Sequence, residues 1–337
     1  MLTTYKTIIK GEFDFGSPKT FEKAFKMFKH REEQMYQKVH VPFDEEAFDS
    51  ETYILNIGRL ITQINKKSWQ ACVEIFEYLS QFAITGQISM WYIDEGKIMI
   101  QKVIEPTNEK TAVQAFLKGR DLVQESGKED LAINSLNKAI SKYEKHGLAY
   151  ERRGFINLKL GNEKDALHDF SKSILFNPNI PEPHYGRAKI FMDQKNWKKA
   201  MPELELGLKK SIPLQPIHWG FRRLKAVVHT EIDEIKQAAQ EYKFFTARNF
   251  SEDDPNFKFK KEALLSYTKL LLDLERFAEV LSLLGKSDKE ATEKADADYF
   301  LFRGIARRGA GKTGFKKDWT ISAKFGNKEA TKLLAKR

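Results

Sequence analysis

The second two thirds of the chain repeats a pattern of small and bulky side chains at the spacing of paired amphipathic helices. Each copy holds a ring, a small residue four places on, an alanine and a further bulky residue. The first clear copy has Tyr150, Gly154, Ala166 and Phe170, and the next, 34 positions later, has His184, Ala188, Ala200 and Leu204. Small residues there allow two antiparallel helices to cross closely, while the bulky ones fill the seam. The pattern predicts repeated helical hairpins.

Looser copies extend this pattern from about residue 110 to the C-terminus. A single hairpin leaves one apolar face uncovered, so neighbouring hairpins stack and bury a continuous core. The last copy repeats two dipeptides of the first clear copy, Arg153-Gly154 and Asp169-Phe170, as Arg303-Gly304 and Asp318-Trp319. We expect a repeat array at 110–337, with units at about 112–146, 147–180, 181–214, 215–250 (degenerate), 258–295 and 297–331.

The first hundred residues follow a different pattern and predict a small α/β module at 1–106. Apolar runs flank a short polar turn at 94–96, which predicts a β-hairpin at about 87–104. Residues 5–15 alternate imperfectly and predict strand structure. The Ser-Pro pair at 17–18 is typical of a helix start, with the serine as cap and the proline in the first turn.

Between these strands the sequence also favours helices. Isoleucines recur at three- and four-residue spacing from Ile54 to Ile64, and Ser50 precedes them as a candidate cap. A second apolar stripe follows at Trp69, Cys72 and Phe76. We therefore expect a divergent helical hairpin at 51–83.

Two interpretations of the N-terminal module stay open. The predicted β-hairpin is apolar on both faces, and such a hairpin is normally covered. In the first interpretation the module is a cap packed on the first repeat, with the N-terminal strand joining the hairpin. In the second it is an oligomerisation or docking module, because an exposed strand edge can pair with another chain.

Charge changes the picture in the repeat half. The formal net charge is +10, but residues 1–106 carry −2 and residues 107–337 carry +12. A basic surface attracts nucleic acid or an acidic protein, although lysine-rich helices also serve solubility alone. The chain has one cysteine, no signal-peptide pattern and no apolar run long enough for a membrane span. We expect a cytoplasmic protein without membrane insertion.

Candidate chemistry is sparse. Gly311-Lys312-Thr313 resembles the end of a phosphate-binding loop, but the first glycine of that loop is replaced by Ala306 and no strand is expected before it. The seven histidines show no metal-ligand spacing, and Cys72 lies on an apolar stripe as a buried thiol would. We therefore expect no catalytic residue, no metal site and no cofactor.

The repeat positions resemble the pattern of the tetratricopeptide-repeat (TPR) family in its bacterial type, including a closing proline at Pro178. The resemblance implies a mainly α fold: a TPR-type α-solenoid of antiparallel helical hairpins behind a small N-terminal α/β module. In this family the first helix of each hairpin lines a concave groove where ligands lie. Carried onto this chain, the groove positions are Phe116, Arg120, Glu151, Phe155, Tyr185, Lys189, Trp219 and Arg223.

The predicted groove is aromatic and mostly basic, which suits a peptide with acidic residues and apolar anchors. Alternatively, some of these rings pack between neighbouring units. One subgroup of the family clamps the acidic tails of heat-shock chaperones through asparagines and basic residues. This chain has Arg120 and Arg152 at the asparagine positions, and Glu182 and Gly186 at two basic positions. The departure argues against a chaperone-tail adaptor.

The sequence thus leads to a non-catalytic scaffold or adaptor that binds a protein or peptide segment in the concave groove. The alternative function is binding of RNA or another polyanion along the basic repeat surface. A homo-oligomer formed through the N-terminal module is compatible with either function.

Overall fold

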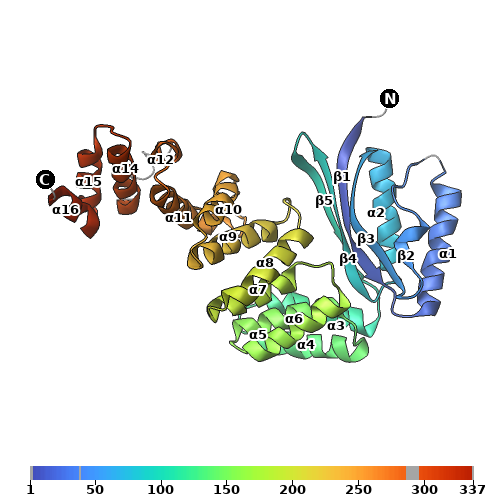
Figure 1. The fold of residues 1–337 in the computed structure, drawn as a ribbon. Helices are drawn as coiled ribbons and strands as arrows, with labels where there is room; N and C mark the ends of the chain where they lie inside the picture. Colours follow the sequence, from blue (N-terminus) through green and yellow to red (C-terminus); the bar gives the residue numbers. More distant parts are fainter. Residues whose placement is uncertain (1–2, 38, 286–295, 336–337) are drawn as a thin grey trace. The chain divides into compact units, whose positions relative to one another are not determined.

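The structure is a computed structural model that describes residues 3–37, 39–285 and 296–335 (Figure 1). It divides into two compact units, Met1–Ile190 and Phe191–Arg337. The boundary falls within helix α7 (Glu182–Asp193) and not at the end of the N-terminal module. The first unit therefore unites that module with the first repeats.

The first unit contains a five-stranded antiparallel sheet with the strand order β2-β3-β1-β4-β5. Helices α1 and α2 cover one face of it (Figure 1), and aromatic side chains fill the space between. Ser17 caps α1 by accepting a hydrogen bond from the Thr20 amide, as the Ser-Pro pair predicts. The elements are β1 (Thr4–Asp14), α1 (Pro18–Met35), the 3₁₀ turn η1 (Glu45–Ala47), β2 (Phe48–Asp49), β3 (Ile54–Asn65), α2 (Lys66–Ser80), β4 (Thr85–Asp94) and β5 (Lys97–Ile104).

The helical hairpin expected at 51–83 is wrong in its first half, because residues 54–65 form strand β3. A bulge explains the misleading spacing. The pairing with β1 shifts register at Lys10/Gly11, so one residue of β3 is skipped. Ile57 and Ile64 therefore both face the core although they are an odd number of positions apart. A strand whose alternation of buried and exposed residues is interrupted once by a bulge shows the three- and four-residue spacing that is typical of a helix.

Within the described residues, each predicted repeat unit from 112–146 to 258–295 holds one pair of helices, whereas the unit at 297–331 holds two helices and the start of a third. The end of the 258–295 unit, at 286–295, lies outside the described residues. In the first compact unit, Met1–Ile190, the helices of the repeats are α3 (Thr111–Val123), α4 (Glu129–Lys142), α5 (Gly147–Lys159), α6 (Glu163–Phe176) and the start of α7. In the second they are α8 (Trp197–Lys210), α9 (Pro216–Glu231), α10 (Ile235–Ala247), the 3₁₀ turn η2 (Phe257–Phe259), α11 (Lys260–Asp273), α12 (Phe277–Leu284), α14 (Ala297–Gly309), α15 (Phe315–Lys324) and α16 (Lys328–Ala335).

The dipeptides that recur in the sequence form the same ion pair in both places. The Arg153 guanidinium on α5 donates to both carboxylate oxygens of Asp169 on α6, at 2.9 and 2.6 Å. Arg303 on α14 does the same with Asp318 on α15, at 3.1 and 2.6 Å. Both aspartates are buried, so each bidentate pair fixes how the two helices of its hairpin face each other.

The second face of the sheet is attached to the repeats of the first unit by buried polar side chains. The Tyr143 hydroxyl donates to Asp14 Oδ2 at 2.6 Å, and the Asn179 amide donates to Glu12 Oε2 at 3.2 Å. Burial raises the pKa of Glu12 to about 7 and also raises the pKa of Asp14. The sheet thus rests on the α4–α5 and α6–α7 connections.

A phenyl ring of α6 packs against glycines of two other helices. A Cβ atom added at Gly154 on α5 would lie 2.7 Å from the nearest ring atom of Phe170, and one added at Gly186 on α7 would lie 2.3 Å away. The Phe170 side chain is fully buried and cannot swing into solvent. Both glycines are therefore required by the close approach of the helices.

Gly186→Ala should lower the free energy of unfolding by about 1–2 kcal/mol, because overpacking against Phe170 outweighs the gain in helix propensity. Urea unfolding followed by circular dichroism measures this difference. Gly58→Ala, in strand β3, is the control for a glycine in open space, since no atom lies within 4 Å of a Cβ added there. Adding Phe170→Leu to Gly186→Ala should recover part of the loss. A Gly186→Ala variant more stable than wild type would contradict this packing.

Glu12 predicts a pH dependence of stability. Its folded pKa of about 7 exceeds the model-compound value of 4.5, so folding favours its protonated form. The contribution of the protonated Glu12 carboxyl to the free energy of unfolding is complete below about pH 4.5 and is lost as the pH rises through about 7. His146 acts in the opposite direction below its unfolded pKa, because burial lowers its folded pKa to about 3.

Comparison of the Glu12→Gln variant with wild type separates the effect of the Glu12 carboxyl on stability from that of other titrating groups such as His146. As the pH rises from about 5 to 8, the free energy of unfolding of the variant should fall less than that of wild type, by up to about 3 kcal/mol. Urea unfolding at a series of pH values measures the two slopes. Glu22→Gln, on the exposed side of α1, is the control and should leave the slope unchanged. Equal slopes in wild type and Glu12→Gln would refute the assignment.

Candidate functional site

The predicted groove positions on α3 and α5 are occupied by other parts of the same unit. The ring of Phe116 lies 4.8 Å from that of His146, whose Nδ1 is 3.1 Å from Thr85 Oγ1 of β4. Arg120 forms ion pairs with Glu105, directly after β5, and with Asp121. The start of the predicted groove is therefore filled by the chain itself.

Glu151, the next groove position, is enclosed as well. Helix α5 contacts strand β4, and the Glu151 side chain is 2% exposed. Its Oε2 lies 3.1 Å from Nε of Arg152. Burial raises the pKa of Glu151 to about 7, although Arg152 opposes the shift. In this structure Glu151 does not reach a partner.

The other three positions of the first unit differ in accessibility. Phe155 packs its ring edge-on against Phe170, with centroids 5.0 Å apart. Tyr185 is half-buried, and Lys189 is exposed. As contacts with a partner, these residues stay predictions.

In the second unit the two predicted groove residues pack against their neighbours. Trp219 Nε1 donates to the Pro213 carbonyl at 2.9 Å, and its ring lies 6.0 Å from that of Phe250. The guanidinium of Arg223 lies over the ring of Phe259, 3.8 Å from its centroid. Packing between neighbouring units, the alternative considered above, therefore accounts for much of this aromatic and basic set.

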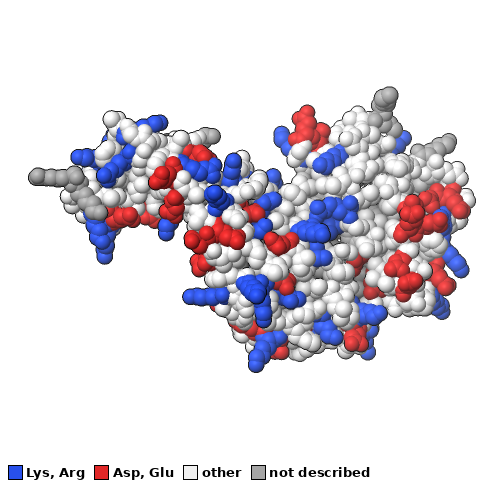
Figure 2. Space-filling model, viewed as in Figure 1, with Lys and Arg blue, Asp and Glu red and all other residues white. Residues whose placement is uncertain are grey.

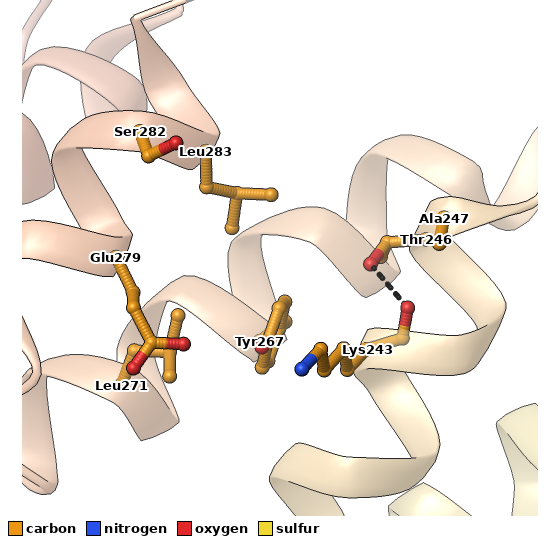
Figure 3. Close-up of a pocket in the computed structure, with 8 residues that line it drawn as sticks. All are labelled: Lys243, Thr246, Ala247, Tyr267, Leu271, Glu279, Ser282 and Leu283. Atoms are coloured by element: carbon orange, nitrogen blue, oxygen red, sulfur yellow. Dashed lines mark hydrogen bonds between the residues drawn. The ribbon is translucent and has the colours of Figure 1, made fainter.

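A hollow of about 270 Å³ lies between α10, α11 and α12 of the second unit (Figure 3). Two buried side chains, Tyr267 and Leu271, lie at its base. Around them the lining is mixed, and the side chain of Lys243 extends toward the ring of Tyr267. The lining residues are Lys243, Thr246, Ala247, Tyr267, Leu271, Glu279, Ser282 and Leu283.

The two charged side chains of the hollow differ in availability. Arg276 binds both carboxylate oxygens of Glu279, at 2.5 and 2.6 Å, so that charge is balanced. Lys243 is exposed and makes no ion pair with another residue of the described part of the chain. Burial raises the pKa of Tyr267 and keeps its hydroxyl protonated. Among the residues that the structure describes, the hollow thus combines an apolar base with one cation that makes no ion pair.

The sequence did not identify this hollow. Tyr267 and Leu271 lie in the predicted unit at 258–295, where their apolar spacing does not distinguish a binding residue from a packing residue. The lining comes from three helices that are separate in sequence, and the spacing of residues within one helix does not predict the space between helices. An exposed lysine near a leucine-rich helix was the only local signal.

Other candidate chemistry is placed as follows. Burial raises the pKa of the Cys72 thiol to about 12, which keeps it protonated and unreactive. Gly311 lies in the turn between α14 and α15 with a φ of 65°. Within residues 3–37, 39–285 and 296–335, no group of three His, Cys, Asp or Glu side chains is arranged to hold a metal ion. No helix in the same ranges is long and apolar enough to cross a membrane.

No family model and no curated protein matches this sequence. Solved structures do match the fold. YrrB, described as a TPR protein with an unusual peptide-binding site, is 15% identical with a TM-score of 0.50, and the match covers 60% of this chain and 97% of YrrB. PilF of Pseudomonas aeruginosa is 13% identical with a TM-score of 0.50, over 68% of this chain and 99% of PilF. The helical hairpins of this chain therefore have the tetratricopeptide-repeat fold, which confirms the resemblance seen in the sequence.

Proposed function

We propose that this protein is a non-catalytic, cytoplasmic scaffold or adaptor that binds a segment of another protein on its repeat array. The hollow between α10, α11 and α12 carries this proposal, because it offers an apolar base beside an available cation. Such a surface can take one side chain of an extended or helical segment. The fold supports a scaffold role, and the peptide site named for YrrB is a property of that protein.

The chemistry of the hollow defines its ligand. An apolar side chain of the partner packs on Tyr267 and Leu283, and burial of a side chain of this size contributes about 1.5–3 kcal/mol. A neighbouring Asp or Glu of the partner pairs with Lys243, which contributes about 0–1 kcal/mol because the site is open to water. The apolar anchor therefore dominates affinity, while the charge selects acidic segments.

The charge distribution favours this function over binding of RNA. On the face drawn in Figure 2, Lys and Arg side chains alternate with Asp and Glu over both units instead of forming a continuous basic area. Binding along a nucleic-acid backbone requires a stripe of uncompensated cations. Several basic residues are also paired internally, as Arg153 is with Asp169 and Arg222 with Glu241.

Filling the hollow or reversing its charge should weaken peptide binding. Random peptides displayed on phage are selected on the full chain, and the affinity of the selected peptides is measured by fluorescence anisotropy. We expect an apolar residue next to Asp or Glu in the selected sequences. Ser282→Trp should weaken their binding about tenfold or more, and Lys243→Glu about three- to tenfold.

Lys236→Glu is the matched control, because it reverses an exposed charge on α10 outside the hollow. It should change affinity by less than about twofold. If the selected peptides bind Ser282→Trp as tightly as wild type, the hollow is excluded as their binding site. If the same peptides no longer bind Lys189→Glu, their site is in the groove of the first unit. Absence of selected peptides together with a gel shift of RNA at low salt would support the polyanion alternative.

A further inference from the structure

The first helical hairpin of the array, α3 with α4, carries an open hollow of about 440 Å³. All its lining residues belong to these two helices, and the sheet contributes none of them. Three of the lining residues are apolar: Ala115 is buried, Leu122 is half-buried and Leu131 is 56% exposed. An apolar surface on a terminal hairpin is one that the next element of a helical stack normally covers.

The recurring glycine contact shows which residues of the first two hairpins correspond. A Cβ atom added at Gly119 on α3 would lie 2.8 Å from the side chain of Leu136 on α4. One added at Gly154 on α5 would lie 2.7 Å from Phe170 on α6. The two contacts are equivalent, so the residues next to them can be compared position by position.

The first hairpin keeps the cation of the recurring ion pair but lacks its carboxylate. Lys118 directly precedes the glycine, as Arg153 does in the second hairpin. Ser135 stands where the second hairpin has Asp169. In the part of the chain that the structure describes, neither Lys118 nor Lys138, the other cation of the hollow, makes an ion pair. Since no Asp or Glu lines the hollow, its charge is complementary to a carboxylate from outside.

The corresponding face of the second hairpin is covered by a helix, α4, which contacts α5. Arg153 Nη1 donates to Oδ1 of Asn137 on α4 at 2.5 Å. Ala149 on α5, which corresponds to Gln114 in the hollow, belongs to the same apolar cluster as the buried side of α4. The α4 residues in that cluster are Ala132, Leu136 and Ala139. A covering helix thus places apolar residues at i, i+4 and i+7, and at i+5 a polar residue that reaches the cation.

We propose that the hollow between α3 and α4 binds an amphipathic helix of another protein, with apolar residues at i, i+4 and i+7 and Asp or Glu at i+5. This helix takes the place on the first hairpin that α4 takes on the second, and its carboxylate pairs with Lys118. None of the residues involved lines the hollow of the second unit, so the inference does not rest on the function proposed above.

A library of helical peptides displayed on phage tests this inference. Its members carry fixed apolar residues at i, i+4 and i+7, and all other positions are randomised. Selection uses the full chain with Ser282→Trp, which fills the hollow of the second unit. We expect Asp or Glu to be enriched at i+5, and no comparable enrichment from a library in which the apolar positions are scrambled.

The affinity of the selected peptides for variants of the full chain is then measured by fluorescence anisotropy. Ser135→Asp supplies the carboxylate that the first hairpin lacks and should weaken binding about three- to tenfold. Lys118→Glu should weaken it about five- to tenfold, and a peptide with Lys at i+5 should recover binding to that variant. Lys164→Glu, on the exposed side of α6 outside the hollow, is the matched control and should change affinity by less than about twofold.

Circular dichroism spectra that match wild type exclude unfolding of the variants. Equal affinity of the peptides for wild type, Ser135→Asp and Lys118→Glu would overturn the proposal, as would equal enrichment from the ordered and the scrambled library. A dimer of the wild-type chain in sedimentation velocity that Lys118→Glu dissociates would also overturn it, because the occupant of the hollow would then be a second copy of this chain.

Discussion

The helical hairpins depend on a close approach of helices, in which a glycine on one helix receives an aromatic ring from another. Gly154 and Gly186 receive Phe170 in the first unit, and Gly304 receives Trp319 in the second. Beside two of these contacts, a buried arginine–aspartate pair fixes the mutual orientation of the two helices. Helices held this closely leave apolar faces for the next pair, so stacking follows from the same contacts.

The sheet module determines how much of the array is accessible in the first unit. Its polar face is held by Tyr143 and Asn179, in connections between repeats. The same attachment places Glu151 in the interior beside β4. The module is thus a cap whose attachment removes the first groove positions from solvent. What it leaves exposed is its own last strand, β5.

The sequence predicted the repeats well because their period records a packing requirement: a large residue at Gly154 or Ala166 cannot be accommodated. It also located the turn before β5, where a short polar segment separates two apolar runs. It failed at β3, because the bulge opposite Gly11 breaks the alternation of a strand and produces helix-like spacing. The hollow could not be predicted, since Lys243, Tyr267 and Leu283 come together only through the packing of three helices.

The central claim is that the repeat array holds a segment of another protein at the hollow of the second unit. Photo-cross-linking in the native cell tests it most directly, with a benzophenone amino acid at Ser282 and, as a comparison, at Lys236. The account predicts a discrete cross-linked protein from Ser282 alone, joined through a peptide with an apolar residue next to Asp or Glu. Cross-links to RNA, or the same products from both positions, would contradict it.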